Sequence, residues 1–249
     1  MANDFTAKTA LITGSTSGIG RATALKLAAG GARVIVSGRD QARGNATVEA
    51  IRAAGGTADF VAAELSDSAS VHALAERAIE LGGGRVDILV NNAGIFPGGP
   101  TVDAVETDID AVAAVNVKAP FLLVARLAPG MVANGSGAIV NISTMVANFG
   151  LPGLALYGSS KAALQLLTKA WAAEFGPAGV RVNAVSPGPT RTEGTAPMGE
   201  GLDQLAATTP AGYPGAAEDV ADAIVFLASD SAKHIHGAIL PVDGGRLAV

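Results

Sequence analysis

The 249-residue sequence contains no cysteine, three histidines and only 4% aromatic residues. The lack of cysteine excludes a disulfide framework, a thiol nucleophile and a cysteine-zinc site. With so few aromatic residues, the core has to consist mainly of alanine, valine, leucine and isoleucine. No Gly-x-Ser-x-Gly motif accompanies the histidines, which argues against a Ser-His-Asp hydrolase. His234 and His236 lack a third ligand nearby in the sequence, so we expect no metal site.

The chain also has little charge and no basic run. Charged residues make up 16% of the sequence, and the formal net charge is −5. This argues against nucleic acid or an anionic membrane as the main partner. The first residues lack the basic region and apolar stretch of a signal peptide, and no apolar run approaches membrane-spanning length. We therefore expect a soluble cytoplasmic protein with no nucleic-acid or membrane partner.

Short apolar runs alternate with helical patterns along the whole chain. The runs that predict strands are 10–12, 34–37, 57–62, 86–90, 138–142, 180–185 and 238–242. Helical patterns cover 22–28, 71–79, 109–127, 157–175 and 217–228. Because parallel strands need helical crossovers, the pattern predicts an α/β fold: one doubly wound parallel sheet of about seven strands with helices on both faces. We expect a single domain spanning residues 1–249.

A glycine-rich turn follows the first predicted strand. It reads Thr13-Gly14-Ser15-Thr16-Ser17-Gly18-Ile19-Gly20 and leads into a helical pattern. A strand, a glycine-rich turn and a helix together present backbone N–H groups to a phosphate. The spacing differs from the common Gly-x-Gly-x-x-Gly fingerprint, and a tight turn without a ligand would look the same. The second buried strand, at 34–37, favours nucleotide binding.

Tyr157 and Lys161 lie four residues apart, which on a helix places them on one face. A free phenol has a pKa near 10 and is a poor base at neutral pH. A nearby ammonium favours the phenolate and lowers that pKa, so the pair can work as an acid/base couple. The spacing alone is a weak signal, because such pairs are usually an edge ring and a snorkelling amine.

Four motifs in order carry a resemblance to a known family. They are Thr-Gly-x-x-x-Gly-Ile-Gly at 13–20, Asn-Asn-Ala-Gly at 91–94, Tyr-x-x-x-Lys at 157–161 and Pro-Gly-x-x-x-Thr at 187–192. Over nearly its whole length the chain resembles the compact branch of the short-chain dehydrogenase/reductase family. The resemblance implies a Rossmann-like fold, a nicotinamide cofactor and reversible hydride transfer between a secondary alcohol and a ketone.

The resemblance also implies roles for four catalytic residues. Tyr157 donates or accepts the proton, and Lys161 lowers the pKa of Tyr157 and bonds the nicotinamide ribose. Asn116 matches the asparagine that holds a proton-relay water. The serine that usually orients the substrate oxygen is replaced by Thr144, and Ser143 directly precedes it.

Further positions are expected to contact the cofactor. Thr192 matches a contact to the nicotinamide carboxamide, and Glu64 stands where the family usually has an aspartate near adenine. An ordinary exposed loop acid is the alternative reading of Glu64. The full expected set is Gly14, Ser15, Thr16, Ser17, Gly18, Ile19, Gly20, Arg39, Glu64, Leu65, Asn92, Ala93, Gly94, Tyr157, Lys161, Pro187, Gly188, Thr190 and Thr192.

The end of the second predicted strand bears on cofactor choice. NAD-dependent enzymes commonly place a carboxylate there for the ribose 2′-hydroxyl, and the matching residue is Gly38. Arg39 follows, and a guanidinium can meet a 2′-phosphate with two hydrogen bonds. Pairing of Arg39 with Asp40 would weaken this effect. The sequence predicts NADP(H) as the preferred cofactor, with NAD(H) as the alternative.

Two stretches suggest the substrate and the assembly. The segment 191–215 is rich in glycine, proline and threonine, and we expect it to form the substrate lid. No charged residue occurs in 127–160, so an acidic carrier finds little to bind there and a small neutral or apolar carbonyl or alcohol is favoured. An apolar patch left exposed by that stretch, together with the resemblance, predicts a homo-oligomer, and a tetramer in particular.

A second function class remains open. A catalytically silent NAD(P)-binding regulator could use the same fold, since fold does not fix function. Such a protein would be expected to lose Tyr157, Lys161 or Asn116, and all three are present. The enzyme is therefore the favoured reading.

Overall fold

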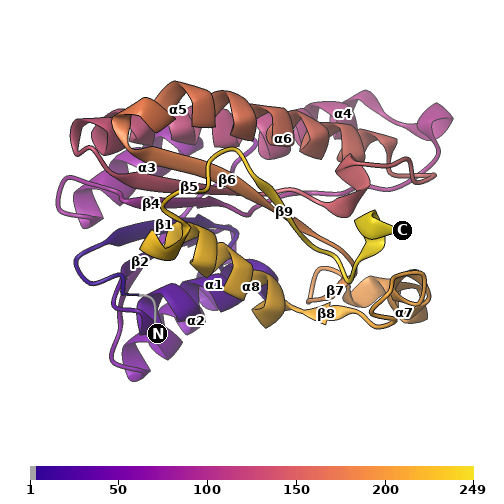
Figure 1. The fold of residues 1–249 in the computed structure, drawn as a ribbon, viewed down its shortest axis with the longest axis horizontal. Helices are drawn as coiled ribbons and strands as arrows, with labels where there is room; N and C mark the ends of the chain where they lie inside the picture. The colour runs from indigo at the N-terminus through magenta and orange to yellow at the C-terminus, as the bar shows by residue number, and fades with distance from the viewer. Residues whose placement is uncertain (1–3) are drawn as a thin grey trace.

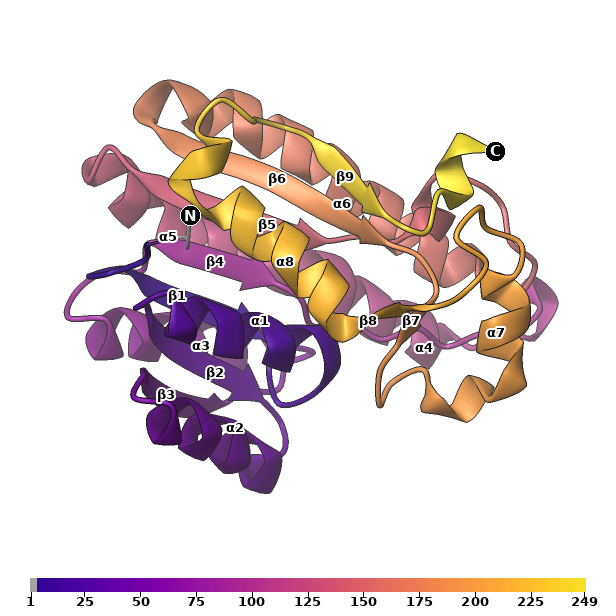
Figure 2. The same ribbon diagram turned by 60° about the horizontal axis from the view of Figure 1, so that its bottom comes forward.

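The computed structural model describes residues 4–249 and confirms the predicted Rossmann-like sheet. Seven parallel strands lie in the order β3-β2-β1-β4-β5-β6-β9 (Figures 1 and 2). The strands are β1 (Thr9–Thr13), β2 (Arg33–Gly38), β3 (Thr57–Ala62), β4 (Ile88–Asn91), β5 (Gly137–Ile142), β6 (Val180–Pro187) and β9 (Ile239–Val242). The strand order reverses between β1 and β4, and ligands of such sheets bind at the carboxyl ends of the strands at this point.

Helices cover both faces of the sheet. Figures 1 and 2 show α1, α2 and α8 on one face and α3, α5 and α6 on the other. The helices are α1 (Gly18–Ala29), α2 (Gln41–Ala53), α3 (Ser68–Leu81), α4 (Glu106–Ala113), α5 (Ala119–Ala133), α6 (Ala155–Phe175), α7 (Glu200–Ala206) and α8 (Ala217–Ala228). A π-helical turn, Ala114–Lys118, joins α4 to α5.

The two faces of the sheet carry two separate hydrophobic cores. Successive residues of a strand point to opposite faces, so Ile12 of β1 packs with α1 and α8, whereas Leu11 packs with α3 and α5. All five residues of β1 are buried. The strands therefore read as continuous apolar runs, as parallel strands covered on both faces do.

Several predicted boundaries need correction. The predicted strand 86–90 is Ile88–Asn91, and the predicted helix 109–127 is the α4–π–α5 unit from Glu106 to Ala133. The segment 191–215 contains α7 and, at its ends, the short strands β7 (Thr190–Arg191) and β8 (Gly215–Ala216), which pair with each other. Their pairing depends on a contact between residues far apart in the sequence, which local composition does not reveal.

We expected no apolar segment of membrane-spanning length, and one helix contradicts this expectation in its length and composition. The continuous helix Glu106–Ala133 is long enough to cross a membrane, and its most apolar window has a mean hydropathy of 1.6. Half of that window is buried inside the protein. Core helices pass the same test, so the length of this helix carries no argument about membranes.

The exposed apolar patch that we expected from residues 127–160 is not formed by those residues. Much of 127–160 is buried, because β5 lies between β4 and β6 in the sheet. The exposed large apolar side chains on the neighbouring helices lie mainly outside that stretch: Phe121 of α5 is 49% exposed and Leu166 of α6 is 69% exposed. An apolar surface is present on these helices, but the uncharged stretch does not form it.

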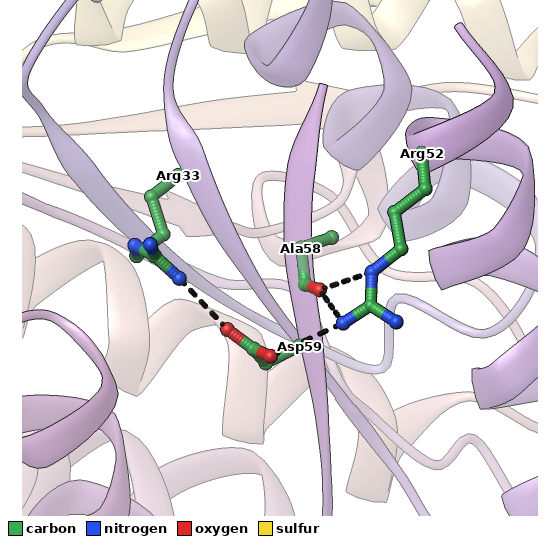
Figure 3. A network of polar contacts seen from close by, with 4 residues as sticks. All are labelled: Arg33, Arg52, Ala58 and Asp59. Carbon is green, nitrogen blue, oxygen red and sulfur yellow. Dashed lines mark hydrogen bonds and ion pairs between the residues drawn. The ribbon is translucent and has the colours of Figure 1, made fainter. Parts of the chain in front are cut away.

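Arg52 covers part of the exposed edge of β3. Arg52 of α2 donates hydrogen bonds to the carbonyl oxygen of Ala58 through Nε at 3.1 Å and Nη2 at 2.6 Å (Figure 3). The Asp59 carboxylate pairs with Arg33 at 3.0 Å and with Arg52 at 3.3 Å. Unpaired edge strands can associate with other chains, and this charged network discourages such pairing.

Candidate active site

Tyr157 lies in the first turn of α6, and Lys161 lies one turn further along the same helix. The Tyr157 ring packs against Phe96, with the ring centroids 5.9 Å apart. Lys161 is only 2% exposed, and its Nζ donates a 2.7 Å hydrogen bond to the carbonyl oxygen of Ile142 at the end of β5. The helix therefore brings the phenol and the ammonium to the carboxyl end of the central strands.

Burial shifts both pKa values, in opposite directions. It raises the pKa of Tyr157 to about 12, and a hydrogen bond with Thr144 opposes this shift. It lowers the pKa of Lys161 to about 8. The expected lowering of the Tyr157 pKa by Lys161 was therefore wrong for the protein alone, because loss of water from around the phenol outweighs the favourable contacts. Tyr157 is protonated at neutral pH.

The two hydroxyls that precede Tyr157 in the sequence have different partners. Thr144 acts on the Tyr157 hydroxyl, whose pKa it lowers. Ser143 Oγ donates to the carbonyl oxygen of Lys161 at 3.4 Å and accepts from Gln165 Nε2 at 3.0 Å. Thr144 therefore points to the reactive phenol, and Ser143 is held by the backbone and side chains of α6.

Asn116 is buried in the π-helical turn between α4 and α5. Its side-chain oxygen accepts from Ile95 N at 2.9 Å, and its nitrogen donates to Ile95 O at 2.9 Å and Ser160 Oγ at 3.0 Å. Ser160 Oγ in turn donates to the carbonyl oxygen of Tyr157. The motifs did not single out Ser160, which links Asn116 to the first turn of α6.

The Asn-Asn-Ala-Gly turn holds the glycine-rich turn in place. Asn92 Nδ2 donates to the carbonyl oxygens of Thr13 at 2.8 Å and Gly14 at 3.1 Å. Thr13 Oγ1 accepts from the backbone nitrogens of Asn92 and Ala93, both at 3.0 Å. A Cβ atom on Gly20 would lie 2.4 Å from Asn92 Nδ2. The third glycine is therefore required by this close contact, and the Thr13 hydroxyl is a positioning group that sequence reasoning missed.

Two adjoining cavities lie at these strand ends. The larger has a volume of about 430 Å³ and the smaller about 190 Å³. The larger is lined by these expected cofactor residues: Gly14, Thr16, Ser17, Gly18, Ile19, Gly20, Arg39, Glu64, Leu65, Asn92, Ala93, Gly94 and Thr192. The smaller is lined by Thr144, Tyr157, Lys161, Pro187, Gly188 and Thr190, and it shares Ile19, Asn92, Gly94 and Thr192 with the larger.

Two expected site residues do not line either cavity. Ser15 is fully buried, and its Oγ donates to Ile12 O at 2.7 Å and accepts from Ser37 N at 3.0 Å. Asn116 lies just behind Gly94, where a Cβ atom would be 3.3 Å from Asn116 Oδ1. Ser15 thus holds the glycine-rich turn against β2, and Asn116 supports the cavity wall.

The end of β2 forms one end of the larger cavity. Asp40 caps α2 by accepting from Arg43 N at 3.0 Å, and its carboxylate also pairs with the Arg43 side chain at 2.8 Å. Arg39 is exposed and lies 3.9 Å from the Glu64 carboxylate. Asp40 therefore pairs with Arg43, not with Arg39. Arg43 also lines this cavity, and the strand-end motif did not point to it.

Apolar residues near the start of α6 and in segment 191–215 lie in separate places. Phe149, Leu151 and Leu154 line a third, open cavity of about 710 Å³ beside the start of α6. Met145 is buried, and Met198 is 43% exposed. Across residues 4–249, no group of three or more histidine, aspartate or glutamate side chains could hold a metal ion.

The residues present fit a dinucleotide. The residues at the start of α1 line the larger cavity, and the Gly18 N–H already bonds a carboxylate, that of Glu193, at 2.9 Å. An anion is thus accepted at this helix N-terminus. The cavity continues to the exposed Arg39 at one end and adjoins the Tyr157 cavity at the other. This arrangement could hold the phosphates between the two ends and place a reactive ring near Tyr157.

Comparisons with known proteins agree with this geometry. A family profile described as enoyl-(acyl carrier protein) reductase matches residues 14–246. A 2,5-dichloro-2,5-cyclohexadiene-1,4-diol dehydrogenase of Sphingobium indicum is 40% identical over 98% of both chains. A solved structure named as a short chain dehydrogenase/reductase family protein is 48% identical, with a TM-score of 0.91 over 99% of this chain and 100% of that one.

A third similar protein was solved with a cofactor. It is a short chain dehydrogenase from Burkholderia cenocepacia in complex with NADP, and it is 36% identical to this chain. The TM-score is 0.93, with coverage of 98% of this chain and 100% of the other.

Proposed function

This chain belongs to the short-chain dehydrogenase/reductase family and is an oxidoreductase; we propose that it interconverts a secondary alcohol and a ketone with NADP(H) as the preferred cofactor. The observation that carries the proposal is the meeting of two cavities, one lined by the glycine-rich turn and the other by Tyr157, Lys161 and Thr144. NAD(H) remains the alternative cofactor.

Tyr157 is the proposed general acid in ketone reduction and the general base in alcohol oxidation. Its pKa of about 12 keeps the phenol protonated at neutral pH, as an acid that protonates the carbonyl oxygen must be. When bound, the nicotinamide supplies or accepts the hydride and, in its oxidised form, a positive charge that favours the phenolate. Thr144, which lines the same cavity as Tyr157, orients the substrate oxygen.

Lys161 and Asn116 are proposed to complete the site. The buried Lys161 ammonium, fixed by Ile142 O, is placed to bond the nicotinamide ribose. Asn116 and Lys161 both lie close to Gly94, since a Cβ atom on Gly94 would be 3.3 Å from Asn116 Oδ1 and 3.2 Å from Lys161 Nζ. This position suits an asparagine that holds a relay water near the lysine.

The segment 191–215 is proposed to cover the substrate. Thr190, Thr192 and Thr195 line the smaller cavity together with Phe96, so hydroxyls and one aromatic ring surround the reactive phenol without a charged lid residue. A small neutral or apolar carbonyl compound suits this lining.

The test is a screen of ketones and secondary alcohols, read by absorbance at the nicotinamide band. We expect cofactor-dependent turnover with at least one neutral ketone. Measured cofactor binding without turnover of any compound in either direction would favour a silent nucleotide-binding protein.

A further inference from the structure

A carboxylate from the proposed lid caps the helix that begins the cofactor cavity. Glu193 Oε2 accepts a 2.9 Å hydrogen bond from the backbone nitrogen of Gly18, the first residue of α1. The side chain of Ser17, which precedes the helix, makes no capping bond, and the first turn contains no acidic residue. The anion at this helix N-terminus is therefore supplied from 175 residues away.

This hydrogen bond lies inside the larger cavity. Gly18 and Glu193 both line that cavity, and Thr192 packs against the turn, since a Cβ atom on Gly18 would lie 3.2 Å from Thr192 Cβ. The N-terminus of the first helix is where a dinucleotide diphosphate binds in folds of this kind. One N–H group cannot serve two anions fully, and a carboxylate beside a diphosphate is repelled by it.

The same bond links one part of the lid, residues 192–210, to the glycine-rich turn, while Ala211 N separately donates to Gly244 O at 2.9 Å. In the part of the chain described, it is the only hydrogen bond from residues 192–210 to any residue before Thr190 or after Gly215. Other polar contacts of this stretch are local, such as the ion pair between Arg191 and Asp203. Releasing Glu193 would therefore remove the hydrogen bond that holds this part of the segment to the glycine-rich turn.

We propose that Glu193 is an internal competitor for the cofactor diphosphate, and that its displacement couples cofactor binding to loss of the hydrogen bond between residues 192–210 and the glycine-rich turn. The inference rests on the proposed function, because it takes the larger cavity to be the dinucleotide site. The competition weakens binding of any nicotinamide dinucleotide equally, because it acts at the diphosphate and not at the adenosine 2′ position.

Glu193→Gln tests the competition, with Glu200→Gln as the matched control in the same segment. We expect the Kd of NADPH, measured by fluorescence titration without substrate, to fall about three- to tenfold in Glu193→Gln, because an anion at a helix N-terminus is worth about this much. The Kd of NADH should fall by the same factor. The control should match wild type within about twofold.

Adenosine 2′-monophosphate separates this effect from a general change in the site. It lacks the diphosphate, so its Kd should be the same in wild type and Glu193→Gln. An unchanged or higher Kd of NADPH in Glu193→Gln would overturn the inference, and so would an equal gain for adenosine 2′-monophosphate. If wild type bound neither NADPH nor NADH, the proposed function would fail and the inference with it.

Trypsin cleavage tests whether the Glu193 bond holds this segment in place. Arg191 is the only lysine or arginine in 191–215, and it is exposed. Without nucleotide, cleavage after Arg191 should be at least about twice as fast in Glu193→Gln as in wild type, because the anchoring bond is weakened. Glu200→Gln should be cut at the wild-type rate. Equal rates in wild type and Glu193→Gln would show that Glu193 does not hold the segment.

Discussion

The Lys161 ammonium donates a 2.7 Å hydrogen bond to the carbonyl oxygen of Ile142, the last residue of β5. This bond fixes a fully buried charge next to the reactive phenol. One backbone carbonyl does not replace the water that the ammonium loses, so the pKa of Lys161 falls from 10.5 to about 8. The protein therefore maintains a costly charge at the site.

This shift predicts a pH-dependent stability difference. Between about pH 8 and pH 10.5 the unfolded chain binds more protons at Lys161 than the folded chain, so the folded state gains stability as the pH rises. The contribution is complete above about pH 10.5 and is lost as the pH falls through about 8. In Lys161→Met it is absent. The difference in unfolding free energy between the two proteins should change by about 2–3 kcal/mol from pH 7 to 10.5.

Urea denaturation at several pH values measures this difference. Lys169→Met, which removes an exposed lysine of the same helix, is the control and should show no comparable change. A difference between wild type and Lys161→Met that stays constant with pH would contradict the assigned shift.

Tyr157→Phe should abolish turnover while leaving the fold and cofactor binding intact. The phenylalanine ring keeps the packing against Phe96, 5.9 Å away, but it has no proton to transfer. We expect kcat to fall at least about 100-fold, the usual contribution of general acid–base catalysis, and the NADPH Kd to change less than about twofold. Tyr213→Phe, at the only other tyrosine, which is 69% exposed, should retain full activity. More than a tenth of wild-type activity in Tyr157→Phe would disprove the assignment.

Thr144→Ala should cost more activity than Ser143→Ala. Thr144 lowers the pKa of Tyr157, whereas Ser143 Oγ is held by Gln165 and the Lys161 carbonyl oxygen. We expect at least about a tenfold loss in kcat/KM for Thr144→Ala, because a hydrogen bond to a charged or reacting group is worth about 1.5–3 kcal/mol. Thr144→Ser should remain active. Initial rates with one ketone show which alanine variant loses more activity. A larger loss in Ser143→Ala would assign orientation of the substrate oxygen to Ser143.

Exposed apolar side chains on α5 and α6 predict self-association. Phe121, half exposed, packs edge-on to Trp171 across the two helices, and Leu166 is 69% exposed. Such a surface marks an interaction site. We expect sedimentation of wild type as a tetramer and of Phe121→Glu with Leu166→Glu as smaller species. Val102→Glu, at another exposed apolar residue, should not change the assembly. A 24.5 kDa wild-type species at micromolar concentration would rule out the oligomer.

The sequence predicted the elements that have strong local signals. Strand 57–62 and helix 217–228 have the predicted bounds. Gly55 and Gly56 separate the strand from the helix before it. Asp219 caps the start of the second element by accepting a hydrogen bond from Ala216 N. Each central strand was also predictable as a continuous apolar run, because helices cover both faces of the sheet. Local patterns therefore predicted most of the fold.

Contacts between distant residues were not predictable in this way. Nothing in Ala114–Lys118 breaks a helix, and the π-helical turn coincides with the bonds of Asn116 to Ile95 and Ser160. The Glu193 bond to Gly18 also depends on how separate elements meet. The pKa of Tyr157 is a further example, since spacing to Lys161 says nothing about the depth at which both are buried.

The end of β2 should set the cofactor preference. Arg39 is exposed at the larger cavity, and Asp40 is engaged with Arg43, so the Arg39 guanidinium is free of that acid and can meet a 2′-phosphate. Its only ion pair among the described residues is the long contact to Glu64, at 3.9 Å. We expect wild type to favour NADPH over NADH at least about tenfold in kcat/KM, as a charge-assisted hydrogen bond would provide.

Reversing this preference requires room for a carboxylate at position 38. A Cβ atom on Gly38 would lie 2.7 Å from Thr16 Cγ2, so Gly38→Asp should be combined with Thr16→Ala and Arg39→Leu. The new carboxylate can accept bonds from a free ribose 2′-hydroxyl and repels a 2′-phosphate. We expect the triple variant to shift the ratio of kcat/KM values toward NADH at least about tenfold, and Thr16→Ala alone to leave the ratio unchanged. A wild-type preference for NADH, or an unchanged ratio in the triple variant, would show that this strand end does not select the cofactor.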